Sequence, residues 1–214
     1  MAEEVSVEIV ALNAADDEPP PHTRMDALER AVVAGGALLA GGVLITGLPR
    51  LAASAPSPKQ DAEIFNFALM IERLQAAFYA ESLMHARLSG QWRQFAQVVA
   101  GHERAHRRFI ESALGTKARE HPGFRFGHTT SDPAKFTAAA VALEDIALAA
   151  YNGQGPNLTA SALGSAARIV SVEARHAAWA RMLAGKNPAP LAVDRPANPA
   201  EARAALKRSG LPGG

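Results

Sequence analysis

The sequence contains no cysteine among its 214 residues. Zinc sites built from thiolates, iron–sulfur clusters and disulfide bonds are therefore excluded, and any metal ion must be bound by oxygen and nitrogen atoms. An excess of one charge is also missing, because 22 Lys and Arg residues nearly balance 21 Asp and Glu residues. The resulting net charge of +1 gives no electrostatic reason to expect a nucleic acid as a partner.

Aromatic residues make up only 6% of the chain, and no run alternates polar and apolar residues as a half-buried strand would. Alanine, the residue with the highest helix propensity, is abundant. This composition predicts an all-helical protein, and the length is that of a single domain.

One pattern occurs twice along the chain. A Glu is followed by a Tyr seven positions later, and then by a Glu-x-x-His pair on what we expect to be the next helix. The apolar residues that precede the first Glu of each copy also match, so we predict a duplicated helical hairpin. The first copy comprises Glu72, Tyr79, Glu103 and His106, and the second comprises Glu144, Tyr151, Glu173 and His176.

The spacing within each copy determines which side chains share a helix face. A helix turns by about 100° per residue, so a Glu and a His three positions apart lie on one face. The faces that carry Glu72 and Glu173 are otherwise apolar, and carboxylates buried there would be costly unless they bind cations. Four carboxylates and two imidazoles suit two Fe ions, with Mn as the alternative. The predicted metal ligands are Glu72, Glu103, His106, Glu144, Glu173 and His176.

Three further polar residues share these faces. Tyr79 and Tyr151 could each hydrogen-bond a ligand carboxylate or relay an electron, and the alternative is an ordinary aromatic residue of the core. Gln75 could also hydrogen-bond a ligand, or it could fill the edge of the core. Both interpretations remain open for all three residues.

A rival motif overlaps the first Glu-x-x-His pair. His102-Glu103-Arg104-Ala105-His106 matches the HExxH signature of zinc proteases, in which both histidines bind zinc and the Glu is the general base. No Gly-x-x-His follows it, and His102 aligns with Val172 in the second copy. We therefore keep a zinc hydrolase as a minor alternative, and place His102 at the solvent edge or next to a ligand.

Turn and cap residues divide the chain into segments. Ser57-Pro58 and Asp132-Pro133 predict helix starts, and the connections run short, long, short, as in a bundle with one crossover. The predicted helices cover about 57–87, 91–114, 132–151 and 157–185, with a further short helix at about 199–209. The predicted segments are a disordered acidic tail at 1–24, an export signal or membrane anchor at 25–56, the bundle at 57–185 and a Pro-rich tail at 186–214.

The segment 31–48 carries no charged residue, and Arg24 and Arg30 precede it. At about 1.5 Å per residue it is just long enough to span a hydrocarbon core. The small residues 53–55 after it predict a signal-like cleavage site, although Pro56 is unfavourable after a cut. We expect the bundle on the extracytoplasmic side of a membrane. If this run is instead a Gly/Ala-rich packing helix, we expect a cytoplasmic protein, and Met25 is a second plausible initiator.

With these residues in view, the chain resembles the ferritin-like superfamily, and most of all its exported ferritin-like domain proteins, the branch that includes plant desiccation-related proteins. The likeness covers about residues 57–185 and is carried by the segments 64–72, 142–145, 172–177 and 124–127. It implies an antiparallel ferritin-like four-helix bundle in which the six residues above bind two metals. It also implies that Glu103 and Glu173 bridge them.

From the ligand set we predict a dimetal carboxylate protein that binds Fe or Mn and reacts with O2 or peroxide, as a ferroxidase or in oxidative stress. Metal ions and the oxidant are then its partners, with the membrane contacted through the N-terminal segment, and no catalytic residue is expected beyond the ligands. The alternative is a non-catalytic, metal-stabilised envelope protein with a protective or interaction role.

Overall fold

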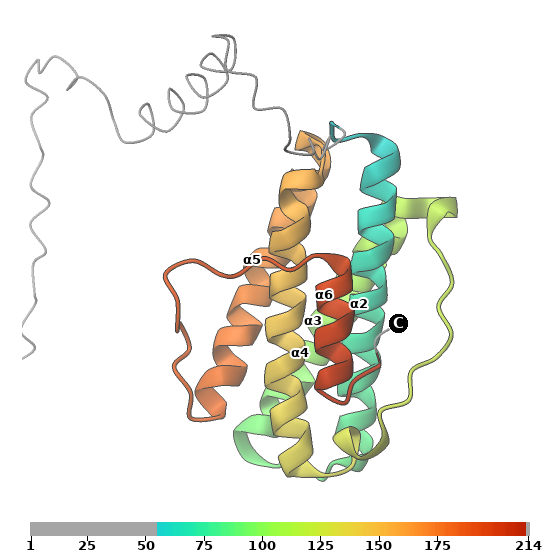
Figure 1. The fold of residues 1–214 in the computed structure, drawn as a ribbon. Helices are drawn as coiled ribbons and strands as arrows, with labels where there is room; N and C mark the ends of the chain where they lie inside the picture. Colours follow the sequence, from blue (N-terminus) through green and yellow to red (C-terminus); the bar gives the residue numbers. More distant parts are fainter. Residues whose placement is uncertain (1–54, 213–214) are drawn as a thin grey trace, which may run out of the picture. The chain divides into compact units, whose positions relative to one another are not determined.

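The computed structural model describes residues 55–212. The predicted acidic tail and nearly all of the predicted export segment lie outside the described residues. Within residues 55–212 the elements are helices only, and no helix is both long and apolar enough to cross a membrane. The predicted all-helical bundle is confirmed (Figure 1). Its helices are α2 (Pro58–His85), α3 (Gly90–Leu114), α4 (Pro133–Gln154), α5 (Ala160–Leu183) and α6 (Pro199–Arg208), and its 3-10 turns are η2 (Gly115–Lys117), η3 (Gly127–Thr130) and η4 (Gly155–Asn157).

Side-chain caps set the helix starts. The hydroxyl of Ser57 accepts a hydrogen bond from the Gln60 amide, and Asp132 accepts one from Lys135, each with a proline in the first turn. The last bundle helix begins at Ala160 rather than near 157, because η4 precedes it and Thr159 is its cap.

Helix α4 continues to Gln154, past its predicted end near Tyr151. The backbone of the C-terminal segment passes directly over Gly153, where a Cβ atom would lie 2.0 Å from the carbonyl oxygen of Ala197. The Ala197 amide also donates to the carbonyl of Ala149 over 2.8 Å. Gly153 therefore permits a close backbone approach and does not end the helix.

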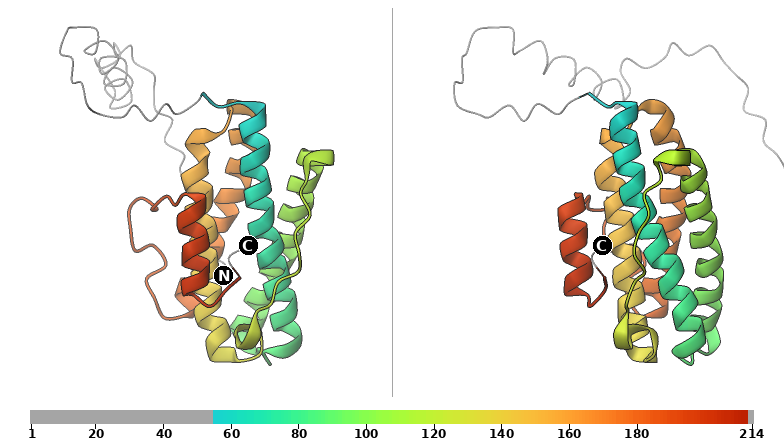
Figure 2. Two further views of the ribbon diagram at one scale, coloured as in Figure 1. Left: turned by 45° about the vertical axis from the view of Figure 1, so that its right-hand side comes forward. Right: turned by 90° about the vertical axis from the view of Figure 1, so that its right-hand side faces the viewer.

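The long connection between α3 and α4 runs along the length of the bundle (Figure 2). It places α4 antiparallel to α2, as the single-crossover topology predicts. Arg73 of α2 holds the crossover by donating to the Arg119 carbonyl at 2.6 Å. It also joins α2 to α3 by donating to Glu111 at 2.9 Å. Asn66 adds hydrogen bonds to the backbone of Lys117 and Arg119.

Two hydrophobic clusters fill the interior of the bundle. One contains Phe78, Phe95 and Phe136, and the other contains Phe65 and Ile110. On each of the four helices, one glutamate lies in sequence between residues of the first cluster and residues of the second. The helices therefore carry four carboxylates into the space between two apolar layers.

Helix α6 packs on α4 and adds to the core, starting with a capping box formed by Asn198 and Glu201. Leu206 is fully buried, whereas Leu191, in the segment before α6, is 48% exposed. We expect Leu206→Ala to lower the free energy of unfolding by about 2–5 kcal/mol and Leu191→Ala to change it by less than about 0.5 kcal/mol. Urea unfolding followed by circular dichroism measures both, and equal effects would contradict the packing of α6 on the bundle.

Candidate metal centre

Each helix of the four-helix bundle contributes one glutamate to a common interior site. Their side chains are entirely shielded from solvent, which is uncommon for carboxylates. His106 and His176 lie one turn after the glutamates of α3 and α5, respectively, so the structure brings all six predicted ligand residues together. The four glutamates are Glu72 from α2, Glu103 from α3, Glu144 from α4 and Glu173 from α5.

The six residues form two overlapping groups. Within each group, one ligand atom per residue can be chosen so that all four atoms lie within 4.8 Å of one another. Glu103 and Glu173 belong to both groups, so two neighbouring positions share two carboxylates. The first group is Glu72, Glu103, His106 and Glu173, and the second is Glu103, Glu144, Glu173 and His176.

The distances between donor atoms agree with those around a common cation. Two atoms that bind one octahedral cation at about 2.1 Å, at right angles, are about 3.0 Å apart. The Nδ1 atom of His106 lies 3.1 Å from Glu173 Oε1, 3.2 Å from Glu103 Oε2 and 3.4 Å from Glu72 Oε2. The Nδ1 atom of His176 lies 3.0 Å from Glu103 Oε1 and 3.5 Å from Glu144 Oε2.

Several of these atoms make no hydrogen bond of good geometry, even where a possible ion-pair partner lies about 3 Å away. Buried polar atoms are normally paired, because leaving them unpaired costs free energy. At this site the unpaired atoms converge from four helices, and cations held between them would satisfy them. The donor set therefore fits metal ions. The unpaired buried atoms are Glu72 Oε2, Glu103 Oε1, Glu144 Oε2, Glu173 Oε1 and His176 Nδ1.

Comparison with known proteins agrees with this geometry. Residues 60–186 match the family model described as the Ferritin-like domain. The chain belongs to the ferritin-like domain family. No curated protein matches the sequence. The matched segment begins in the first turn of α2 and ends just after α5, so this ferritin-like domain contains all six clustered residues and leaves α6 outside the match.

Burial and mutual proximity shift the pKa of the clustered groups. Burial raises the pKa of Glu72 to about 8 and that of Glu173 to about 7, and it also raises the pKa of Glu103. Burial alone would lower the pKa of both histidines, but contacts with carboxylates outweigh it. The pKa of His106 rises to about 12 and that of His176 to about 10. Without metal, the ferritin-like domain therefore holds extra protons at this site.

Each tyrosine hydrogen-bonds a glutamate of the other half of the bundle. The hydroxyl of Tyr79 on α2 donates to Glu144 Oε1 on α4 over 2.5 Å. Tyr151 on α4 donates to Glu72 Oε1 on α2 in a short hydrogen bond. In both glutamates this leaves Oε2 facing the cluster. Burial raises the pKa of both phenols well above 10, so they remain donors at neutral pH.

Gln75 is fully buried and contacts two of the clustered carboxylates. Its Nε2 donates to Glu144 Oε1 and to Glu173 Oε2, in both cases over 3.2 Å. Gln75 thus orients Glu144, which belongs to the second group only, and Glu173, which belongs to both groups. The hydrogen bonds of Gln75 and both tyrosines to the clustered glutamates favour the hydrogen-bonding interpretation over that of ordinary core residues.

His102 lies outside both groups but contacts a member of the second. Its Nδ1 is 2.8 Å from Nε2 of His176, and the two rings stack with centroids 5.1 Å apart. A zinc hydrolase would need His102 and His106 on one ion, and the structure gives that interpretation no support. Alignment of the two halves could not reveal the contact, because the second half has Val172 at this position.

We expect His102→Ala to weaken the binding of one metal ion by about 10–100-fold, the usual effect of losing a partner that orients a ligand. His102 fixes the ring of His176 so that Nδ1 faces the cluster. Isothermal titration with Mn(II) measures the affinity. His128→Ala is the matched control, because His128 is exposed in η3. Equal affinities for the two variants would show that the contact does not orient His176.

Proposed function

We propose that this ferritin-like domain binds two iron ions, or two manganese ions, and reacts with O2 or peroxide. The observation that carries the proposal is the pair of four-residue groups that share Glu103 and Glu173 inside the bundle. Glu103 and Glu173 would contribute to both metal positions, and a pair of redox metal ions held there would supply one electron each.

The chemistry of the donors favours iron or manganese. Carboxylate oxygens and imidazole nitrogens suit these metals, the two groups contain only Glu and His, and the sequence has no cysteine to supply a thiolate. Four carboxylates also balance the charge of two divalent cations, so the filled site is close to neutral. When bound, two Fe(II) ions supply the two electrons that, with two protons, convert O2 to hydrogen peroxide.

The protein's own residues would hold the site in shape during this reaction. Tyr79, Tyr151 and Gln75 donate hydrogen bonds to the carboxylates from the side away from the cluster. The fully buried rings of Phe78, Phe95 and Phe136 all pack against the ring of Tyr79, which bonds Glu144, and would keep that side of the site apolar. The buried phenols also offer a nearby electron source, since each is hydrogen-bonded to a carboxylate of the site, which can take the phenol proton when the ring is oxidised.

Metal analysis together with oxidation kinetics tests the proposal. The domain is purified metal-free and titrated with Fe(II) under anaerobic conditions, and the complex is then mixed with O2 or with hydrogen peroxide while Fe(III) formation is followed by absorbance. We expect close to two Fe(II) per chain and rapid oxidation by at least one of the oxidants. Binding of two ions without faster oxidation than free Fe(II) would contradict the redox role and favour the non-catalytic, metal-stabilised alternative.

We also propose that the domain belongs to the exported branch of the family and works on the extracytoplasmic side of a membrane. The support is the uncharged segment 31–48, preceded by Arg24 and Arg30. Arginines that flank an apolar segment favour the cytoplasmic side of a membrane, so the bundle that follows the segment would lie on the extracytoplasmic side. Cell fractionation with a tag after Gly214 is the test. Recovery of the full-length protein entirely in the cytosol would contradict export.

A further inference from the structure

A series of aromatic rings connects the metal centre with the surface of the bundle. Tyr79 of α2 donates a hydrogen bond to Glu144, and its ring packs edge-on against Phe95 of α3 with centroids 5.8 Å apart. The rings of Trp92 and Trp179 also pack on Phe95, with centroids at 5.4 Å and 5.1 Å. The series therefore runs from a tyrosine bonded to a clustered glutamate to two tryptophans.

The exposure of these rings increases along the series. Tyr79 and Phe95 are entirely shielded from solvent, whereas Trp92 and Trp179 are partly exposed. Trp92 lies in the first turn of α3, and Trp179 lies near the end of α5. They are the only two tryptophans in the sequence. Every indole of the protein thus contacts solvent on one side and the ring next to Tyr79 on the other.

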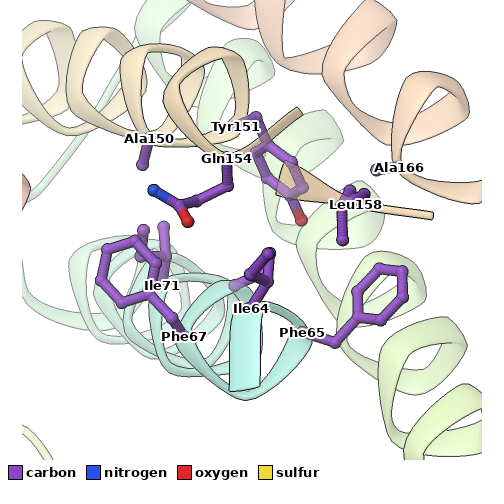
Figure 3. Close-up of a pocket in the computed structure, with 10 residues that line it drawn as sticks. Ile64, Phe65, Phe67, Ile71, Ala150, Tyr151, Gln154, Leu158 and Ala166 are labelled. Atoms are coloured by element: carbon purple, nitrogen blue, oxygen red, sulfur yellow. The ribbon is translucent and has the colours of Figure 1, made fainter. Parts of the chain in front are cut away.

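Tyr151, the counterpart of Tyr79 in the second half of the bundle, has no such connection. It hydrogen-bonds Glu72, but it lines a small space formed mainly by aliphatic residues, among them Ile64 and Leu158 (Figure 3). Within residues 55–212, which include both tyrosines and both tryptophans, no ring contact involves Tyr151. The two tyrosines are therefore alike in their bonds to the site and differ in their access to tryptophan.

The residue types in the series suit electron transfer. Indole and phenol rings lose one electron more readily than the other side chains of this cysteine-free protein. Electron transfer between two rings slows steeply with distance, and packed rings between them shorten the gap. Phe95 is one such bridge, and Phe136 is a second between Tyr79 and Trp92, with centroids at 6.2 Å and 5.8 Å. Ring pairs at these distances also stabilise the core, so the series serves packing in any case.

We propose that the two tryptophans supply electrons to the metal centre through Phe95 and Tyr79, a role that rests on the proposed function. Two Fe(II) ions provide two of the four electrons that reduce O2 to water. The aromatic series provides the other two, one at a time. Their source is a one-electron reductant of the ascorbate type, which reaches the partly exposed indoles from solution.

Each passage along the series moves one electron inwards. Tyr79 gives an electron to the oxidant held at the centre, and its hydroxyl proton passes to Glu144, to which it already donates a hydrogen bond. A tryptophan then gives an electron to Tyr79, and the proton returns from Glu144. The oxidised tryptophan takes an electron from ascorbate, which also releases one proton. Two passages, with four protons from ascorbate and water, complete the reduction of O2 to two water molecules.

Pulse radiolysis of the metal-free protein tests the path without any iron. Azide radicals oxidise the accessible indoles and become azide ions, and the tryptophan and tyrosine radicals absorb at different wavelengths. We expect the tryptophan signal to decay as a tyrosine signal grows, at a rate independent of protein concentration. Tyr79→Phe should abolish the tyrosine signal, whereas Tyr151→Phe, which also removes one buried hydroxyl, is the matched control and should keep it. No transfer in the wild type, or unchanged transfer in Tyr79→Phe, overturns the path.

The supply of electrons to the centre is tested with iron. The Fe(II)-loaded protein is mixed with O2 in the presence of ascorbate, and the hydrogen peroxide released is measured. The variant that combines Trp92→Phe with Trp179→Phe should release more peroxide per Fe(II) oxidised than the wild type, because its second pair of electrons is missing. Equal release overturns the role. If the wild type binds Fe(II) but does not react with O2, the proposed function fails and the role falls with it, whereas the transfer measured without metal still stands.

Discussion

Replacing either shared carboxylate, as Glu103→Gln or Glu173→Gln, is expected to reduce metal binding from two ions per chain to fewer than one. Each residue belongs to both groups of donors, so its loss leaves both ions without a ligand. Gln keeps the shape of the side chain and removes the negative charge, so the buried core stays filled. The affinity for both ions should fall by more than about 100-fold, because even the loss of a partner that only orients a ligand costs 10–100-fold.

Two kinds of control make this result specific. Glu72 and Glu144 each belong to one group only, so Glu72→Gln and Glu144→Gln should each lose about one ion and keep the other. Glu111→Gln, on the same helix as Glu103 but paired with Arg73 at the surface, should bind as the wild type does. Elemental analysis after dialysis and titration with Mn(II) measure the stoichiometry. Two ions retained in both Glu103→Gln and Glu173→Gln would exclude bridging by these residues.

The metal-free domain is expected to lose stability as the pH rises from about 5 to about 9, while the stabilisation by bound metal increases over the same range. Burial raises the pKa of Glu72 from 4.5 to about 8. The folded state therefore keeps a proton that the unfolded chain has already lost, and this contribution to stability disappears as the pH passes through 8. Glu173 acts in the same direction, with a pKa raised to about 7.

The two histidines shift stability in the same direction at higher pH. Their contacts with carboxylates raise the pKa of His176 from 6.5 to about 10 and that of His106 to about 12. The stabilisation of the folded state by the two histidines is complete below pH 6.5. It is lost as the pH rises towards their pKa values in the folded state. Metal ions replace all of these protons, so the metal binds more tightly as the pH rises.

Melting temperatures with a chelator and with saturating Mn(II), measured between pH 5 and pH 9, check this prediction. The difference between the two melting temperatures should grow with pH. Glu72→Gln removes one of the titrating groups, so the pH dependence of the metal-free variant should be weaker than that of the wild type. A metal-free wild type that becomes more stable between pH 5 and pH 8 would contradict the protonated site.

Local sequence signals were sufficient to predict the number and order of the helices in the bundle and most of their ends. Ser57-Pro58 and Asp132-Pro133 were recognised as helix starts, and both caps are present in the structure. The long connection predicted a single crossover, which is confirmed. The end of α4 was predicted near Tyr151, whereas the helix runs to Gln154. Gly153 does not end the helix but admits the backbone of Ala197. That contact joins segments far apart in the sequence, so no local pattern contains it.

The sequence by itself determined which residues face the interior, because a helix repeats its faces with a fixed period and the Glu, Tyr and Glu-x-x-His pattern occurs twice with nearly the same spacing. Only the tertiary structure decided the partners. Tyr79 bonds Glu144 and Tyr151 bonds Glu72, each across the bundle. His102 meets His176 across the bundle. The period of a helix determines in which direction each side chain points from that helix. The contacts between helices depend on how the helices are placed relative to one another, and the packing of the whole core determines that placement.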